Sequence, residues 1–378
     1  MSETGGRKIP GGFTGPVYFH LAPPGPPDRA VYQHAAVCLA EGLGELGIPY
    51  FSNRDYWRTG RGENDYLFRK DPRVGQEDCR VAVIDRCWFS SGGKFPPRLV
   101  RPGRRHLAVC LDLSDGHVTP SWRRDFSRFD CILRGHWNRN CYYPKNFRPW
   151  AFGLSRRIIA AAAPAGPFSA RRRVLLANFR LPHPVRTMAE KVFYPRLAPV
   201  LPLDRTAEGW EEAPADPEAR LFWEQTGRRH HPAYFRRLKE SAASAAFSGF
   251  FLPSLPRLLR RPRGERLAAR LGRRPDPESR RVSQWESWRF WETLAAGAAA
   301  VHLDFESYGL APPVLPVNGV HYLGLSPENL DRTVRRLADD PGWLEGISAA
   351  GRDWALKHYG PRATAVRFLE AITGGTRP

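Results

Sequence analysis

Three charged side chains recur at intervals of three in the stretch SQWESWRFWETLAAGAAAVHLDFE, residues 283–306. On a helix, Glu286, Arg289 and Glu292 would share one face, beside a neighbouring face of aromatic and aliphatic side chains. Carboxylates and guanidinium groups form charge-assisted hydrogen bonds with polar ligands. This charged face is therefore the first candidate for a ligand site.

The elements that position this face follow from the same stretch. Gly297 has the place of a helix C′ residue, since glycine takes positive φ without steric cost. Residues 298–303 then predict a short buried strand, and Asp304 follows at its carboxyl end. A helix that leads into such a strand is half of an α/β unit, and ligands of such sheets bind beyond the carboxyl ends of the strands.

The run RFWETLAAGA, residues 289–298, resembles the R-x-x-E-x-x-A-x-G signature of GT-B glycosyltransferases. The similarity covers about residues 282–369, including SAAGRDWALKHYGPRA, and is closest to bacterial family 1 enzymes and to the spore-maturation (CgeB-like) type. It implies an α/β fold of the GT-B class, with two Rossmann-like domains facing a cleft. The expected parts are an acceptor-binding domain at residues 1–160, a nucleotide-sugar-binding domain at 171–358, and a helix at 359–378 that packs back toward the first domain.

The resemblance implies roles for the charged face itself. Glu292 would hold hydroxyl groups of a nucleotide-diphosphate sugar, although an exposed ion pair with Arg289 also accounts for these two residues. Many retaining relatives carry two Glu residues seven apart, whereas Glu286 and Glu292 are six apart. Trp285 and Glu286 would instead hold the sugar.

Other donor-binding residues are expected after two predicted strands of the second half, at residues 173–179 and 245–252. Arg180 and Arg186 would meet the diphosphate, with solvated arginine as the alternative. Phe251, together with its neighbour Phe250, would stack on the nucleobase at the end of the second of these strands, with a core position as the alternative. The sequence also predicts a strand at 198–202, a loop at 208–220, a helix at 234–243 and an exposed basic insert at 257–281.

The first half predicts a strand at residues 16–21, a helix at 28–46 with Asp28 as N-cap, and a strand at 48–52. Further strands are expected at 80–84, 106–111 and 130–133. No G-x-G-x-x-G follows the first strand, which argues against a dinucleotide-binding fingerprint.

Catalytic groups are sought at the ends of these strands. His20 could contact the acceptor or act as a base, or it could be a histidine whose hydrogen bonds are satisfied within the fold. Asp112 or Asp115 could be the base of an inverting reaction, or it could cap a helix or form a turn.

Composition sets the remaining limits. The formal charge is +20, and only seven of the 58 basic residues are lysine, so genomic G+C bias and an anionic ligand both account for the excess of arginine. Six scattered cysteines without a C-x-x-C pair argue against a zinc site and fit reduced thiols. We find no apolar run long enough for a membrane span and no signal peptide, so we expect a cytoplasmic protein.

These observations favour a metal-independent glycosyltransferase without a cofactor, which moves a sugar from a nucleotide-diphosphate sugar to a hydroxyl or amine. The resemblance favours retention of configuration. The acceptor would be a small molecule, a glycan or a protein, with peripheral contact to an anionic membrane and no nucleic-acid partner. The alternatives are a basic α/β protein that binds an anionic polymer or a membrane surface, and an inactive GT-B-like partner subunit.

Overall fold

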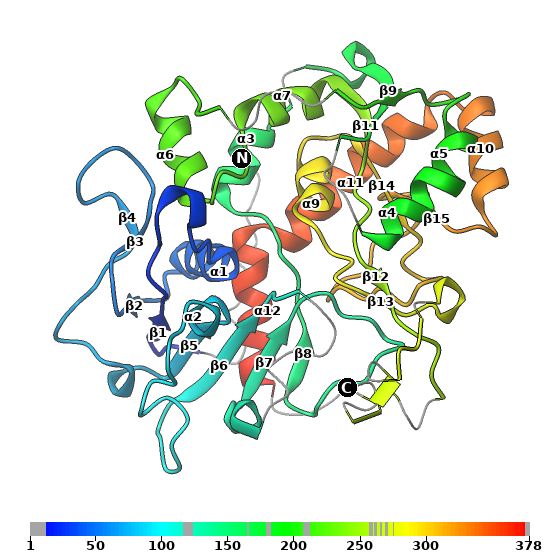
Figure 1. The fold of residues 1–378 in the computed structure, drawn as a ribbon. Helices are drawn as coiled ribbons and strands as arrows, with labels where there is room; N and C mark the ends of the chain where they lie inside the picture. The colour runs from blue at the N-terminus through cyan, green and yellow to red at the C-terminus, as the bar shows by residue number, and fades with distance from the viewer. Residues whose placement is uncertain are drawn as a thin grey trace.

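The computed structural model describes residues 13–115, 124–164, 166–178, 183–206, 212–256, 260, 263–264, 267–268, 271–274 and 276–374. Two α/β units, each built on a parallel sheet, make up this part of the chain (Figure 1). The first unit is coloured blue to cyan-green and the second green to orange. Within the described residues, no helix is both long and apolar enough to cross a membrane.

The first sheet has six strands in the order β2-β1-β5-β6-β7-β8, and every neighbouring pair is parallel. The strands in the middle of this sheet are short buried runs rich in Val, Ile and Leu, as expected for a sheet covered on both faces. The strands are β1 (Val17–His20), β2 (Tyr50–Ser52), β5 (Val81–Asp85), β6 (Leu107–Asp112), β7 (Cys131–Arg134) and β8 (Phe147–Pro149). The five strands predicted here are confirmed to within two residues at each end.

The helix predicted at residues 28–46 is shorter than expected. Helix α1 spans His34–Glu45, and Pro27–Arg29 form a separate 3-10 turn, so Asp28 is not its N-cap. The side chain of Gln33 bonds both the N–H and the carbonyl of Ala22 (2.8 and 3.1 Å), which holds the preceding loop against the end of β1. Gly47 closes the helix at φ +69°, as predicted.

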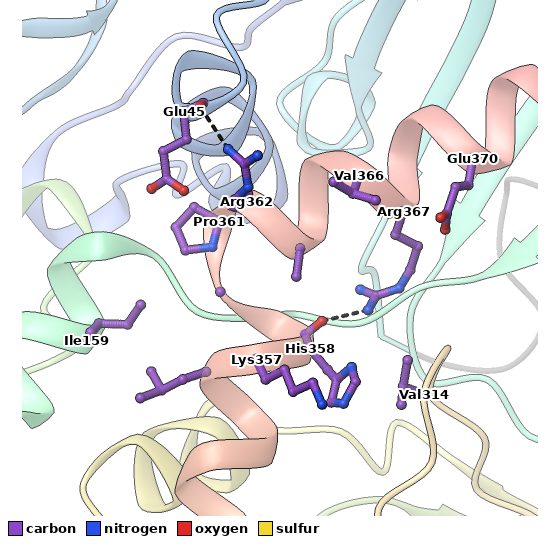
Figure 2. A pocket seen from close by; sticks show the side chains of 13 residues that line it. Glu45, Ile159, Val314, Lys357, His358, Pro361, Arg362, Val366, Arg367 and Glu370 are labelled. Atoms are coloured by element: carbon purple, nitrogen blue, oxygen red, sulfur yellow. Dashed lines mark hydrogen bonds between the residues drawn. The ribbon is translucent and has the colours of Figure 1, made fainter. Parts of the chain in front are cut away.

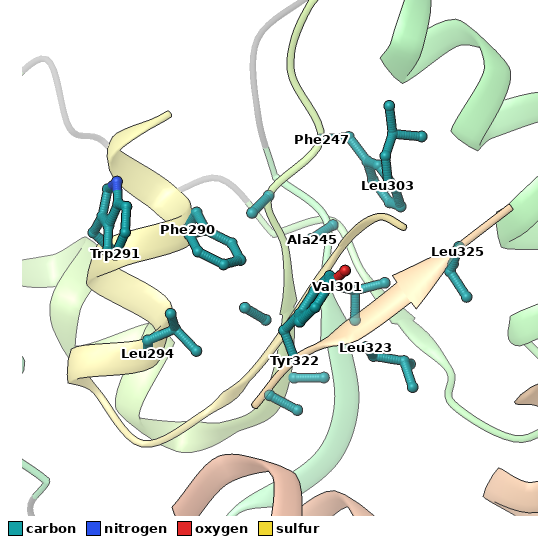
Figure 3. Close-up of a cluster of buried hydrophobic side chains, with 14 of the residues drawn as sticks. Ala245, Phe247, Phe290, Trp291, Leu294, Val301, Leu303, Tyr322, Leu323 and Leu325 are labelled. Carbon is teal, nitrogen blue, oxygen red and sulfur yellow. The ribbon is translucent and has the colours of Figure 1, made fainter. Parts of the chain in front are cut away.

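The second sheet is also parallel, in the order β10-β9-β11-β14-β15. Helix α9 (Trp288–Ala295) covers one face with Phe290 and Leu294, which point toward the core formed by β11 and β14, whereas Trp291 lies on the opposite side of the helix and stacks on Trp354 (Figure 3). Gly297 follows this helix at φ +64°, as predicted. The strands are β9 (Arg172–Leu176), β10 (Leu203–Asp204), β11 (Ser241–Ala245), β14 (Ala299–Leu303) and β15 (Leu323–Leu325).

Two strands predicted in this unit lie elsewhere. The sequence predicts a strand at residues 245–252, but β11 ends at Ala245, and only β12 (Phe250–Phe251) falls in that range, paired antiparallel with β13 (Val282–Ser283). The five small residues of β11 are all buried between neighbouring strands, so tertiary context overrides their weak strand propensity. Residues 198–202 form a turn before β10 rather than a strand.

Helices on the second unit complete the fold. Helix α4 (Pro184–Met188) continues through a π-helical turn (Ala189–Phe193) into α5 (Tyr194–Leu197). Later helices are α7 (Pro232–Glu240), α10 (Leu330–Asp339) and α11 (Trp343–Tyr359). Gly360 separates α11 from α12 (Pro361–Thr373), which packs on α1 with Phe368 and Leu369 in the core of the first unit (Figure 1).

One segment of the second half lies on the first unit. Residues 212–231, here named the strap, include helix α6 (Pro217–Gln225), where a loop was predicted. The strap packs against the hairpin of β3 (Tyr56–Arg58) and β4 (Tyr66–Phe68): the Gln225 side chain bonds the N–H and carbonyl of Arg58 (3.1 and 3.0 Å), and the ring of Phe222 lies beside that of Trp57. The strap therefore joins the two units.

Candidate functional site

A cavity of about 370 Å³ lies beyond the carboxyl ends of β9 and β11, where the strap returns to the second unit. We name it the arginine cavity because four of its lining residues are arginines and only one is an acid. The lining residues are Arg186, Gly227, Arg228, Arg229, His230, His231, Tyr234, Trp288, Arg289 and Glu292. Its place at strand ends is the usual ligand position in parallel α/β sheets.

Two helices begin at this cavity, and each contributes an arginine from its first turn. Arg186 lies in α4 and donates from Nε to the carbonyl of Phe247 (2.9 Å), which follows β11. Arg289 lies in α9 and donates from Nη1 to Oδ1 of Asn178 (2.9 Å), which follows β9. The strand ends thus fix the direction of both guanidinium groups.

These two arginines repel each other. Burial, together with the nearby charge of Arg289, lowers the pKa of Arg186 to about 10. Arg186 therefore stays charged at neutral pH, but at a cost in free energy that an anion between the two groups would offset.

The acid of the cavity lies one helical turn after Arg289. Oε1 of Glu292 lies 2.5 Å from Nδ1 of His230, and the Glu292 side chain is buried. Burial, followed by the charge of Glu292, raises the pKa of Tyr234 far above its usual range, so this phenol is neutral. Glu292 is thus held by a strap residue rather than lying in solvent.

The strap loop that lines the cavity has a constrained backbone. Gly227, Arg228 and His230 all have positive φ, at 65°, 59° and 58°. This conformation disfavours residues with a Cβ, and such strain gathers at functional sites. Arg228, Arg229 and His230 are not predicted as site residues by the sequence, because they lie between the loop predicted at 208–220 and the helix predicted at 234–243, in a stretch with no recognised motif.

Glu286 and Trp285 lie at the junction between the two units. Oε1 of Glu286 accepts from the Phe152 N–H (2.6 Å) and the Trp291 indole (2.8 Å), and Oε2 accepts from the His136 N–H (3.3 Å). The Trp285 indole is fully buried and donates to a backbone carbonyl of the first unit (3.0 Å). The structure therefore does not bring the two residues predicted to hold the sugar into the arginine cavity.

Three candidate catalytic residues lie on the rim of the first sheet: His20 and Asp112 are hydrogen-bonded, and Oδ1 of Asp115 lies 3.8 Å from Nε2 of His136. Nε2 of His20 lies 2.7 Å from Oε1 of Gln76, and burial lowers the pKa of His20 to about 4. Oδ1 of Asp112 accepts from Arg134 (2.9 Å) and from the Ser114 hydroxyl (2.5 Å), with the carboxylate fully buried. None of the three lines the arginine cavity.

The remaining residues predicted to bind the donor do not all lie in one place. Arg180 lies outside the described residues. Phe251 is a core residue whose ring lies 6.2 Å from that of Tyr308, whereas Phe250 is 36% exposed with its ring 4.7 Å from that of His183. Of the predicted donor set, Arg186, Arg289 and Glu292 meet in the arginine cavity.

A larger cavity of about 520 Å³ lies at the bend between α11 and α12, as Figure 2 shows. Its main cations already have partners: Arg362 donates to the Glu45 carbonyl (3.1 Å) and Arg367 to the His358 carbonyl (2.6 Å). Its lining also includes two acids, Glu45 and Glu370, and it lies at a helix bend rather than at strand ends, so we regard the arginine cavity as the better candidate for an anionic ligand. In the described part of the chain, no three His, Cys, Asp or Glu side chains gather so as to hold a metal ion.

Comparison with known proteins supports the fold. The sequence matches no model of a protein family and no curated protein. Three similar solved structures cover 96% of this chain each. They are an alpha-glucosyltransferase with UDP-glucose and DNA containing an abasic site (TM-score 0.50, 9% identity, 100% of that chain), an alpha-glucosyltransferase with UDP (0.50, 8%, 100%), and AviGT4, a glycosyltransferase involved in avilamycin A biosynthesis (0.48, 16%, 98%).

At these identities the likeness shows the fold alone. Two parallel α/β units face each other in a single chain, and the two structures at TM-score 0.50 align along almost all of it. The chain therefore has the GT-B fold of glycosyltransferases, as the sequence predicted.

Proposed function

We propose that this protein is a glycosyltransferase that uses a nucleotide-diphosphate sugar. The observation that carries the proposal is the arginine cavity: Arg186 and Arg289 lie together at the strand ends of the second unit, with Glu292 one turn further along α9. The structural neighbours solved in complex with UDP or UDP-glucose support the same donor class.

Each group in the cavity has a role in this proposal. Arg186 and Arg289 bind the diphosphate and stabilise the negative charge that develops on it as the sugar leaves. Glu292, oriented by His230, accepts hydrogen bonds from sugar or ribose hydroxyls. Of the two phenylalanines expected to stack on the nucleobase, Phe250 is the one we propose, because its ring is partly exposed beside His183, whereas Phe251 is buried.

The finer features of the reaction are also proposals. The arginines supply the positive charge for a metal-independent reaction. Retention rests on the resemblance of the Glu292 helix to retaining enzymes. Two of the three candidate bases of an inverting reaction, His20 and Asp112, are each bonded within the first unit, and the third, Asp115, lies near His136. The subfamily of the spore-maturation type stays a prediction.

The acceptor is a hydroxyl or an amine of a small molecule, a glycan or a protein. Nucleic acid was not expected as a partner from the sequence, but one structural neighbour was solved with DNA, and the net charge of this chain is +20. DNA therefore belongs in the acceptor assay, as do anionic vesicles. Binding of DNA or vesicles that weakens steeply with salt, without any nucleotide binding, would favour the basic binding protein instead.

A thermal-shift screen with UDP, GDP, TDP, CDP and their sugar conjugates tests the proposal. A nucleotide at one hundred times its Kd adds about 2.7 kcal/mol to the stability of the native state. We expect one base to stabilise the wild type. The additional stabilisation by its sugar conjugate should be lost in Glu292→Ala and kept in Glu345→Ala, an exposed glutamate on α11.

The reaction is then measured as release of the nucleoside diphosphate from the donor that binds. Absence of stabilisation by every nucleotide and conjugate contradicts the proposal. Stabilisation without sugar turnover, with each acceptor class present, indicates the inactive GT-B-like partner subunit.

A further inference from the structure

A second cavity, of about 340 Å³, lies beneath the strap and beside the arginine cavity. We name it the strap cavity. Three helices enclose it: α3 (Arg156–Ala162), α6 and α7. Tyr32 and the β3 residue Trp57, both of the first unit, close one side. Its volume lies at the lower end of the range for small-molecule sites.

The lining of the strap cavity is mostly apolar. Ile158 and Phe235 are buried at its wall, and alanines of α3 and α6 leave the space open. The guanidinium carbon of Arg157 lies 3.7 Å from the centre of the Phe222 ring, so this cation covers an aromatic face instead of filling the space. An apolar molecule would thus meet surface on several sides.

The charges at the strap cavity are of one sign. Arg236 and Lys239 lie three residues apart on α7, and both line the cavity. Among its lining residues there is no Asp or Glu, and neither cation has a hydrogen-bond or ion-pair partner in the described part of the chain. Glu218, the partner of Arg157 at 3.7 Å, lies outside the lining.

We propose that the strap cavity is a second binding site, for a small molecule with an apolar body and one anionic group. The apolar body lies between Ile158, Phe222 and Phe235, and the anion lies at Arg236 and Lys239. The class is an aromatic or short aliphatic carboxylate, sulfonate or phosphate. This site is separate from the donor site, because its two cations lie on α7 and its apolar wall comes from α3, α6 and α7.

The two cavities share one wall. His230 lines both, and it is also the residue bonded to Glu292. An occupant of the strap cavity therefore contacts the side chain that orients the acid of the arginine cavity. It also contacts helix α6, which holds the strap on the first unit.

The probe for a test is 8-anilinonaphthalene-1-sulfonate, whose fluorescence rises in apolar sites. N-phenyl-1-naphthylamine, which has the same rings without the sulfonate, serves as the neutral control. We expect one sulfonate probe per chain, and an affinity about tenfold lower in Arg236→Gln/Lys239→Gln. The neutral probe should bind equally to wild type and to this variant.

Two further variants complete the design. Arg332→Gln/Arg335→Gln removes two exposed cations at the same spacing on α10 and should leave the affinity for the sulfonate unchanged. Ala161→Trp fills the cavity and should abolish binding of both probes, while circular dichroism shows that it folds.

The proposal would be overturned if Arg236→Gln/Lys239→Gln and Arg332→Gln/Arg335→Gln lost affinity for the sulfonate probe equally. Undiminished binding of the probes to folded Ala161→Trp would also overturn it. If Ala161→Trp does not fold, the two charge variants and the neutral probe still show whether Arg236 and Lys239 bind the sulfonate. Because no nucleotide is present, these outcomes are independent of the glycosyltransferase proposal.

Discussion

The rims of the two sheets differ in how their charges are compensated. On the first rim, Asp112 is bonded to Arg134 and His20 to Gln76, so the polar groups satisfy one another. On the second rim, Arg186 and Arg289 lie together in a cavity with Glu292 as its one lining acid.

The comparison separates stability from binding. A buried group that is paired within the protein contributes to folding, whereas two like charges held together are stable only at some cost. We therefore expect substitutions on the first rim to change the free energy of unfolding, and substitutions on the second rim to change ligand affinity.

Asp112→Ala should have the largest effect on stability. It leaves Arg134, which is 1% exposed, without the carboxylate bonded at 2.9 Å, and breaking a buried pair costs about 3–5 kcal/mol. Urea denaturation measures this loss, and Asp112→Asn should lose less. Nucleotide affinity should not change. If stability is kept while sugar transfer is lost, Asp112 is catalytic and the comparison fails.

Glu286 predicts a dependence of stability on pH. Burial raises its pKa from 4.5 to about 7, against the opposing effect of the N–H donors at its carboxylate. Between these values the native state holds a proton that the unfolded state has lost, so stability falls as pH rises through this window. The full difference corresponds to about 3 kcal/mol.

Glu286→Gln isolates this effect, because glutamine does not titrate in the window. The wild type should lose about 3 kcal/mol relative to the variant between pH 4.5 and 7, and nothing further above pH 8. Glu41 and Asp85, whose pKa values burial also raises, are present in both proteins and cancel. A difference that stays flat with pH contradicts the burial account of Glu286.

Arg289→Gln should weaken nucleotide binding by about 2 kcal/mol, or roughly thirtyfold in Kd, because a charge-assisted hydrogen bond to phosphate is lost. Isothermal titration calorimetry with the nucleotide found in the screen measures it. The stability of the ligand-free protein should change little, since glutamine can still bond Asn178 and the repulsion of Arg186 is removed. Unchanged affinity would exclude Arg289 from the donor site.

Gln225→Ala should have the smallest effect, about 1 kcal/mol of stability, because it removes the paired hydrogen bonds between the strap and Arg58. It should also lower nucleotide affinity several-fold, since Gln225 is followed directly by the loop that bears Arg228 and His230. Glu224→Ala, on the same helix, is the matched control. Equal affinity in both variants would show that the strap does not organise the arginine cavity.

The sequence predicted elements whose signals are local. In the helix that carries Arg289 and Glu292, apolar side chains recur at intervals of three and four residues. The strands β1, β5, β6 and β7 are short apolar runs. These features need no information about distant residues, so they could be found from the chain alone.

The misplaced features depend on contacts between distant segments. Glu286 bonds Phe152 and His136, more than 130 residues earlier, so its role at the junction leaves no trace near position 286. Helix α6 did have a local signal in Asp216-Pro217, an N-cap followed by proline, and Oδ2 of Asp216 accepts from Ala219 N–H (2.7 Å). This local signal predicts the start of helix α6, but it does not predict that the helix packs on the first unit.

The most direct test of the central claim uses inorganic pyrophosphate and the melting temperature. We predict a saturable rise with pyrophosphate in the wild type. The rise should vanish in Arg186→Gln/Arg289→Gln and persist in Arg332→Gln/Arg335→Gln, at a salt concentration high enough to screen surface charge. An equal rise in all three proteins would show that the arginine cavity is not an anion site, and the proposed donor site would be wrong.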